Sequence, residues 1–500
     1  MNEIKELLRI VSKHRMKKID VLSTTHESEN DYAKAAKSIQ GGMINTDDEM
    51  AALISYKKSS LKFRTFKVRL KEKLLNSLLF LDFDPREIAG YGRAMSVCSR
   101  NQHGIRLLLY LSARNSAMHL AKITLKKAIE FEFAEIALFC AKTLRTQSSF
   151  IGDQKQFDMY NKLHDFYAMQ VAAESKAAES LEKIYVNQVN FNVIDADDIK
   201  LIKSSLSTVK ILMVNHKSYQ VGLNYYRIKA ISELISKSYH SSLKTWEEFD
   251  GFIEKYRHFE YKVRKGESSL QKMYCYVMLR DYKNGEKCAG QCEVLFKKST
   301  NNWLIYKEYY FLLLMHTKKY LKAGQTINVV TNDGHFKNWD VNRREKWQIM
   351  EAYYNLMYRA GKIKKGATGI RQAKYRFTKF LNNAPILSKD KKGHNASLLI
   401  IQAVYLLLEH NYEGFENIME SLKRYASRYF PEGQNFRSLI FIKMIITVFK
   451  CGYDKKVIQI QTKRLYTQLS KLQFKHVSTT EGLEVVPFMD LWEIVLESLE

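Results

Sequence analysis

Proline is scarce in this 500-residue chain, which has only Pro85, Pro385, Pro431 and Pro487. The stretch from Arg86 to Ala384 contains none. Proline disrupts a helix interior because it removes a backbone donor and clashes with the preceding turn. A stretch of this length without proline fits one helix after another, joined by short turns. It also argues against an all-β fold, which would need many turns built on glycine and proline.

Long apolar runs and a cysteine framework are also missing. The longest candidate, Ser438 to Phe449, is interrupted by Lys443 and is too short to span a bilayer. The first residues are charged and amphipathic, unlike a signal peptide. The six cysteines follow no regular spacing, which is typical of reduced thiols. We therefore expect a cytoplasmic protein without membrane insertion.

Motifs of catalysis are absent as well. The sequence has no His-Glu-x-x-His and no Gly-x-Ser-x-Gly, and the lysine of Gly361 to Gly366 lies at the wrong end for a phosphate loop. Asp82 and Asp84 superficially resemble the Asp-x-Asp of phosphotransferases, but Arg86 stands where those enzymes carry Thr or Val. We predict that the chain is not an enzyme and needs no cofactor.

A metal site is not predicted either. Cys288 and Cys292 are one helical turn apart and Cys275 is near them in sequence, but no second close pair of ligands accompanies them. A structural zinc site usually needs about four Cys or His ligands. These cysteines are better explained as small apolar residues of a core.

What the sequence does contain is a recurring pattern. A Leu/Tyr-rich amphipathic stretch is followed by two or three polar or small residues and then by a tyrosine that opens the next amphipathic stretch. The junctions are Met278–Tyr282, Met315–Tyr320, Leu408–Tyr412 and Phe449–Tyr453, with a degenerate copy at Tyr358–Lys362. The spacings of 38, 42, 50 and 41 residues predict stacked helical pairs, since one pair cannot bury its apolar face alone.

The junction Lys319-Tyr320-Leu321-Lys322-Ala323 resembles that of the tetratricopeptide repeat, in which a tyrosine opens the second helix and a small residue follows three positions later. Tyr282 with Gly285 repeats this pattern, whereas Tyr412 and Tyr453 are followed by Phe415 and Lys456 at the small position. The resemblance covers roughly residues 200–472. It implies a concave surface that binds peptides or other proteins.

A second resemblance is to a group of helical proteins of the bacterial phylum Bacteroidota. It rests on the tract Tyr309–Leu314 and on the C-terminal sequence Leu491–Leu499. This resemblance implies no activity.

The domain organisation follows from these patterns. We predict an N-terminal helical region at 1–150, in which 57–81 is one helix with a stripe of Phe63, Phe66, Leu70, Leu74 and Leu78. A long helix capped by Asp153 connects it, over 151–194, to a solenoid at 195–472 that includes a capping box at Thr245–Glu248. The long helix fits either a spine for its neighbours or a coiled-coil seam. Residues 473–500 would cap the solenoid, because its last apolar face must be covered.

Positive charge is the second feature of the chain. Its net charge is +27, and residues 301–400 carry 19 basic against 6 acidic residues. No acidic residue lies between Glu351 and Asp390. We call 359–379 the basic stretch. It is interleaved with aromatic residues, and its cations are Arg359, Lys362, Lys364, Lys365, Arg371, Lys374, Arg376 and Lys379.

Three interpretations of the basic stretch are open. It is a solvated helix face with its aromatic residues in the core, a nucleic-acid site in which cations meet phosphates and aromatics stack on bases, or a site for an acidic protein. A second basic cluster lies at 57–73.

The sequence thus predicts an all-α fold, a right-handed solenoid of tetratricopeptide-like helical hairpins with a divergent N-terminal region. We expect a non-enzymatic scaffold or regulatory protein that binds a peptide or protein partner in the concave groove. The alternative is a nucleic-acid-binding helical array that uses residues 57–73 and 359–379. The sequence does not identify the partner or the oligomeric state.

Overall fold

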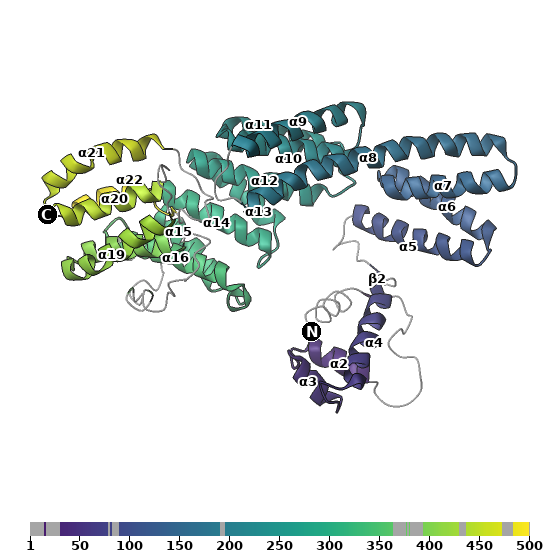
Figure 1. The fold of residues 1–500 in the computed structure, drawn as a ribbon, viewed down its shortest axis with the longest axis horizontal. Coiled ribbons are helices and arrows are strands. Elements are labelled where there is room, and N and C mark those ends of the chain that lie inside the picture. The colour runs from purple at the N-terminus through teal and green to yellow at the C-terminus, as the bar shows by residue number, and fades with distance from the viewer. Residues whose placement is uncertain are drawn as a thin grey trace. The chain divides into compact units, whose positions relative to one another are not determined.

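The computed structural model describes residues 15–16, 31–78, 81–82, 90–190, 196–363, 377, 380, 394–429, 437–472 and 484–499. In these ranges the chain is helical, with twenty α-helices. The one exception is a short antiparallel pair of strands, β1 (Arg15–Met16) and β2 (Leu81–Asp82). The prediction of an all-α fold built from neighbouring helices is confirmed (Figure 1). None of the described helices is both long and apolar enough to cross a membrane.

The chain divides into two compact units. Unit 1 comprises residues 1–173 and 256–261, and unit 2 comprises residues 174–255 and 262–500. The boundary between the two units falls inside the long helix α8 (Gln154–Asn190). Asp153 does cap α8, because its Oδ1 accepts a hydrogen bond from the backbone of Gln156 at 2.9 Å.

The first part of unit 1 has its own small core. It consists of α2 (Asp31–Gln40), α3 (Asp47–Leu53) and α4 (Leu61–Leu78). Phe63, Phe66, Leu70 and Leu74 are buried, as the stripe predicted. The predicted bounds of 57–81 were too wide: the Ser60 hydroxyl caps the helix at Phe63, and Leu81 belongs to β2.

The second part of unit 1 is a row of antiparallel helices: α5 (Gly90–Tyr110), α6 (Arg114–Glu130), α7 (Ala134–Phe150) and the first half of α8. Small buried residues let these helices approach one another closely, since Ala117, Ala121, Ala137 and Ala141 are fully or almost fully buried.

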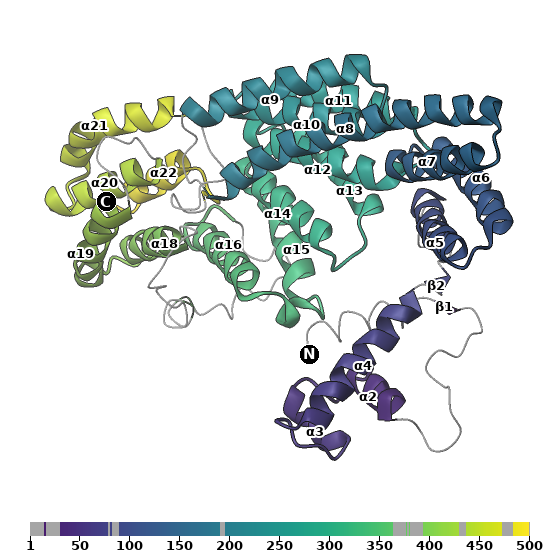
Figure 2. The same cartoon turned by 45° about the vertical axis from the view of Figure 1, so that its right-hand side comes forward.

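Unit 2, taken by itself, is a longer row of neighbouring helices (Figure 2). Consecutive helices pack on one another from α9 to α11 and from α13 to α21, and a single core runs through α12 to α22. The elements are α9 (Ala196–Asn215), α10 (Tyr219–Ile235), α11 (Tyr239–Glu254), α12 (Tyr261–Leu279), α13 (Tyr282–Leu295), α14 (Asn301–His316), α15 (Tyr320–Thr331), the 3₁₀-helix η1 (Phe336–Asn338), α16 (Val341–Arg359), α18 (His394–Leu408), α19 (Tyr412–Tyr429), α20 (Arg437–Lys450), α21 (Lys455–Lys471) and α22 (Phe488–Glu497).

Most of these helices are joined by the same type of turn. A residue with left-handed φ ends the helix, and the next amide bonds back to a carbonyl five residues earlier, which is the Schellman arrangement. In the turn at Lys318, for example, the Lys319 amide donates to the Leu314 carbonyl at 2.8 Å. The left-handed residues are Ser112, Glu132, Gly152, Lys237, Arg280, Lys318, Gly361, His410 and Gly452.

The turns extend the repeat beyond the range that the sequence indicated. Five of them coincide with the predicted junctions in unit 2. Three others, at Ser112, Glu132 and Gly152, are spaced by twenty residues; the first two lie in the N-terminal region predicted at 1–150 and the third lies just after it. The helical-hairpin pattern is therefore shared by both units at the level of the turn.

Two local predictions have clear outcomes. A Cβ on Gly285 would lie 2.3 Å from Leu313 Cδ2, which explains the small residue after Tyr282. The predicted capping box at Thr245 was wrong. α11 begins at Tyr239, and the Thr245 hydroxyl inside it donates to Glu233 at 3.0 Å.

Candidate partner-binding surface

Two cations of the basic stretch lie in the described residues, at the end of α16, and both have acidic partners. Arg359 is bonded to both carboxylate oxygens of Glu409, and its guanidinium lies 5.4 Å from the ring centroid of Tyr405. The Glu409 carboxylate raises the pKa of Arg359 through these hydrogen bonds. Lys362 donates to both carboxylate oxygens of Glu497, at 2.7 and 2.9 Å.

These pairs are partly exposed, so their net stabilising effect is at most ~1 kcal/mol each. Their side chains nevertheless connect α16 to α18 and to α22. The six remaining cations, Lys364, Lys365, Arg371, Lys374, Arg376 and Lys379, lie outside the described residues.

The described aromatic residues near the basic stretch belong to the core. Phe377 is buried and stacks on Tyr405, with ring centroids 4.0 Å apart. Tyr353 and Tyr354 are also buried. Stacking on a nucleobase needs an accessible aromatic face. These three rings therefore match the interpretation that places the aromatics between helices.

The second basic cluster lies on α4 and just before it, and some of its cations form ion pairs within unit 1. Lys58 pairs with Asp48 and Lys67 pairs with Asp47, each at 2.7 Å. Lys62, Arg64 and Arg69 have exposed side chains. The cluster thus presents fewer exposed cations than its sequence suggests.

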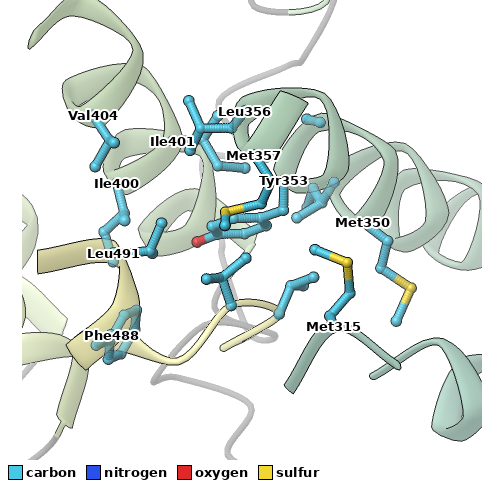
Figure 3. Close-up of a cluster of buried hydrophobic side chains, with 14 of the residues drawn as sticks. Met315, Met350, Tyr353, Leu356, Met357, Ile400, Ile401, Val404, Phe488 and Leu491 are labelled. Atoms are coloured by element: carbon cyan, nitrogen blue, oxygen red, sulfur yellow. The ribbon is translucent and has the colours of Figure 1, made fainter. Parts of the chain in front are cut away.

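Helix α22 lies against one side of the C-terminal helical pairs. α22 packs on α18, α20 and α21. Phe488 of α22 stacks on Phe441 of α20, with ring centroids 4.7 Å apart. Figure 3 shows Phe488 and Leu491 beside Tyr353 of α16 and Ile400 of α18. The side of α14, α16, α18 and α20 that faces α22 is called the inner side below.

A buried ion pair fixes the segment that leads into α22. Arg437 Nε and Nη2 donate to Glu484 Oε2 and Oε1, at 2.8 and 2.7 Å, and both side chains are almost fully buried. Arg437 Nη1 also donates to the carbonyls of Leu469 and Leu472, at the end of α21. Glu484 Oε1 accepts from the Phe488 amide at 2.9 Å. One pair thus holds the end of α21 and the start of α22.

Two further contacts tie α22 and its lead-in segment to α14. The His316 ring lies 2.9 Å through Nε2 from the Glu484 carbonyl oxygen. Lys318 pairs with Asp490 at 3.2 Å. Together with the Lys362–Glu497 pair, these contacts place the helix across the ends of α14 and α16 as well as along α18 and α20. The sequence predicted a cap on the last apolar face, but α22 reaches across several first helices.

Other residues that face the inner side are identified by their distance in sequence from the left-handed residue of the turn that follows. Ile400 lies ten residues before the left-handed residue of its turn, His410. Glu308 of α14 and Glu351 of α16 have the same offset from Lys318 and Gly361. Equivalent positions of stacked helical pairs point to the same side of the array.

One aromatic residue extends this set towards the N-terminal end of unit 2. Val404 lies six residues before His410, and Tyr274 of α12 lies six residues before Arg280. We call Tyr274, Glu308 and Glu351 the polar inner row. All three are half-buried, and burial raises the pKa values of Tyr274 and Glu351.

The cysteines lie in the helix core. Cys275 of α12 and Cys288 and Cys292 of α13 are buried, and the Cys288 thiol donates to the Ser269 carbonyl at 3.3 Å. Burial raises the pKa of Cys275 to about 12. Within the described ranges, no three His, Cys, Asp or Glu side chains gather as metal ligands would. Asp82 lies in β2, opposite Arg15, and Asp84 is outside the described residues.

Comparison of this chain with protein-family models, with curated proteins and with solved structures found no match. The sequence did not indicate that α22 would lie on the inner side. Its pattern is amphipathic, with Phe488, Leu491, Trp492, Ile494 and Val495 buried and Glu493 and Glu497 exposed, and such a pattern predicts a buried face without identifying the helices that cover it.

Proposed function

We propose that this protein is a non-enzymatic scaffold or regulatory protein that docks a peptide or helix of a protein partner on the inner side of unit 2. In this proposal the array is a right-handed, tetratricopeptide-like solenoid with a divergent N-terminal region, and the protein works in the cytoplasm. In this proposal, the groove predicted from the sequence is the inner side, which is formed by the first helix of each pair.

One observation carries the proposal. The first helices of the C-terminal pairs already hold a helix, α22, through apolar contacts such as Phe441–Phe488 and through ion pairs at Lys318 and Lys362. The side that receives α22 therefore has the shape and chemistry to bind an amphipathic helix. The polar inner row continues that side onto α12, α14 and α16 with groups suited to hydrogen bonding.

The alternative is nucleic-acid binding through residues 57–73 and 359–379. It requires cations that can release counterions from phosphates. Lys58 and Lys67 in the first range and Arg359 and Lys362 in the second each have a carboxylate partner within the protein. These four cations make the alternative less favourable than binding of a protein.

Purification of the tagged chain from its native cells tests the choice between the two. Samples are prepared at low salt, at high salt and after nuclease treatment, and the co-eluting molecules are identified. We expect a defined protein that survives both high salt and nuclease, since a docked helix is held largely by apolar contact.

Nucleic acid that is present at low salt and lost at high salt would support the alternative instead. In that case, changing Lys364, Lys365, Arg371 and Lys374 to Glu should abolish the nucleic-acid binding. A competition with random nucleic acid is the necessary control, because a protein with a net charge of +27 attracts polyanions without specificity.

A further inference from the structure

Two neighbouring turns of unit 1 expose large apolar side chains. The turn between α5 and α6 carries Tyr110 and Leu111, which are 85% and 70% exposed. The turn between α7 and α8 carries Phe150 and Ile151, which are 65% and 72% exposed. We call these four residues the apolar tip. Exposed apolar residues that gather in one place generally mark an interaction site.

The two turns lie side by side. The guanidinium of Arg114, at the start of α6, lies 5.6 Å from the ring centroid of Phe150, at the end of α7. Figures 1 and 2 show both turns at the same end of the row formed by α5, α6, α7 and the first half of α8. Arg114 thus bridges the two turns, and the four exposed apolar side chains lie at the same end of this row of helices.

The fold itself does not require this exposure. The turn at the opposite end of the row, between α6 and α7, has the same Schellman geometry and also carries two aromatic residues. There Phe133 is buried, and its ring centroid lies 5.0 Å from that of Tyr91, while Phe131 is half-buried. The turn motif itself therefore does not require its aromatic residues to be exposed.

Charge is also distributed unevenly along the row. The half nearest the tip, residues 101–121 and 142–162, carries six cations and two anions. The far half, residues 90–100, 122–141 and 163–173, carries five cations and four anions. The tip thus combines apolar side chains with an excess of positive charge. The six cations of the near half are Arg106, Arg114, Lys142, Arg145, Lys155 and Lys162, and the two anions are Asp153 and Asp158.

This combination fits a lipid surface better than a protein. A standard protein interface involves about 20–30 residues on each side, whereas the tip is a protrusion built from two short turns. A bilayer interface accepts such a protrusion. Tyr and Phe fit the boundary between headgroups and acyl chains, aliphatic side chains enter the apolar layer, and Arg and Lys meet anionic headgroups.

We propose that the apolar tip, Tyr110, Leu111, Phe150 and Ile151, binds the surface of an anionic lipid bilayer, with Arg114 and the other cations of the near half meeting the headgroups. The contact is peripheral and involves no spanning segment. It is independent of partner docking in unit 2, so either binding activity exists without the other.

Co-sedimentation of the full chain with vesicles tests the proposal. The vesicles are phosphatidylcholine alone, or an equimolar mixture of phosphatidylcholine and phosphatidylglycerol, at physiological ionic strength. We expect the wild-type chain to bind the mixed vesicles. The double variant Phe150→Ser/Ile151→Ser should lose about tenfold or more in partition coefficient, since apolar insertion and charge act together.

Two controls keep the test interpretable. Val294→Ser in unit 2 removes a side chain that is 88% exposed and should leave vesicle binding unchanged. Phe150→Trp keeps a large aromatic residue at the tip, so it should keep binding, and its emission should shift to the blue on mixed vesicles. All the altered side chains are exposed, so these variants should fold like the wild type.

Three results would overturn the proposal. The first is a Phe150→Ser/Ile151→Ser variant that binds as well as the wild type, because net charge alone would then explain the binding. The second is a wild-type chain that ignores both kinds of vesicle. The third is a tip variant that releases a partner protein while the wild type ignores vesicles, which would make the tip a protein interface.

Discussion

At the scale of single residues, burial decides what the titratable groups of this fold can do. Five of the six cysteines are buried, and only Cys451 is half-buried. Burial raises the pKa of Cys140 and of Cys275 to about 12, so both remain protonated thiols at neutral pH. Since the thiolate is the reactive form, such cysteines are inert.

The first prediction concerns thiol reactivity. In the native protein one thiol per chain, that of Cys451, should react quickly with Ellman's reagent, and the other five should react only after denaturation. Cys451→Ser should remove the fast phase. Two or more fast thiols in the native protein would show that the helices of the core open more readily than the structure implies.

The second prediction concerns Glu351, a half-buried carboxyl on the inner side. Burial raises its pKa above the ordinary 4.5, so its protonated form is favoured in the folded state. The stabilising effect of that proton is complete below pH ~4.5 and is lost as pH rises through the folded-state pKa. Glu351→Gln should therefore stabilise the protein at pH 7 and have little effect at pH 4.

Denaturant unfolding of both proteins at the two pH values measures this difference. An equal effect at pH 4 and pH 7 would show that the titration of Glu351 is not responsible. Glu409→Gln is a suitable comparison, because it removes a carboxylate that pairs with Arg359 at the protein surface.

At the scale of elements, the turns explain both the success and the limits of the sequence analysis. Four of the five junctions in unit 2 were recognisable because a tyrosine follows the turn, whereas the degenerate copy at Tyr358–Lys362 has its tyrosine before Gly361. The equivalent turns at Ser112, Glu132 and Gly152 lack that tyrosine. Their similarity to the turns of unit 2 is therefore seen only in the φ angles and hydrogen bonds. A backbone motif that tolerates Ser, Glu, Lys, Arg and His leaves little trace in sequence.

The third prediction follows from the strain in these turns. Left-handed φ is costly for residues that carry a Cβ and is freely adopted by glycine. Arg280 has φ of 53° and an exposed side chain, so Arg280→Gly should stabilise unit 2 by ~0.5–1 kcal/mol. The reverse change Gly361→Ala, at φ of 70°, should destabilise it by a similar amount. Midpoints of thermal unfolding that move the other way would contradict this account.

The fourth prediction concerns the buried pair that holds α22. Arg437→Met leaves the Glu484 carboxylate buried without its partner, so it should destabilise the fold by ~3–5 kcal/mol. The matched control is Arg424→Met, which breaks an exposed pair with Glu420 and should cost no more than ~0.5 kcal/mol. Equal losses of stability would mean that the Arg437–Glu484 pair does not fix this segment.

The packing position of α22 could not be predicted from the sequence, for a physical reason. The periodicity of an amphipathic helix predicts that one face is buried, but it does not say against which helices. α22 exposes Glu493 and Glu497 and buries its opposite face, and the neighbours of that face are set by long-range contacts such as His316 with Glu484.

At the candidate site, the sequence likewise could not predict which cations of the basic stretch are paired with carboxylates. Sequence placed eight cations close together, which suggested a common surface. The structure shows that two of them have intramolecular partners far away in sequence, Glu409 and Glu497. Charge density along a chain therefore predicts a binding surface only where tertiary contacts leave the charges accessible.

At the scale of the whole molecule, two units built on the same turn are proposed to have separate tasks. In unit 2 the inner side of the helical pairs would dock a helix or peptide, with α22 as the intramolecular example of such docking. In unit 1 the apolar tip would meet a lipid surface. The central claim is the first of these, because it gives the repeat architecture its function.

The most direct test compares partner capture by the wild type with capture by the variant Tyr274→Phe/Glu351→Gln, which removes two polar groups of the inner row without changing side-chain size. Our account predicts that a defined protein is retained by the wild type at high salt. The variant should retain at least tenfold less of it, a difference of ~1.4 kcal/mol in binding, while the exposed control Val294→Ser retains it fully. Equal retention by all three proteins would contradict docking on the inner side.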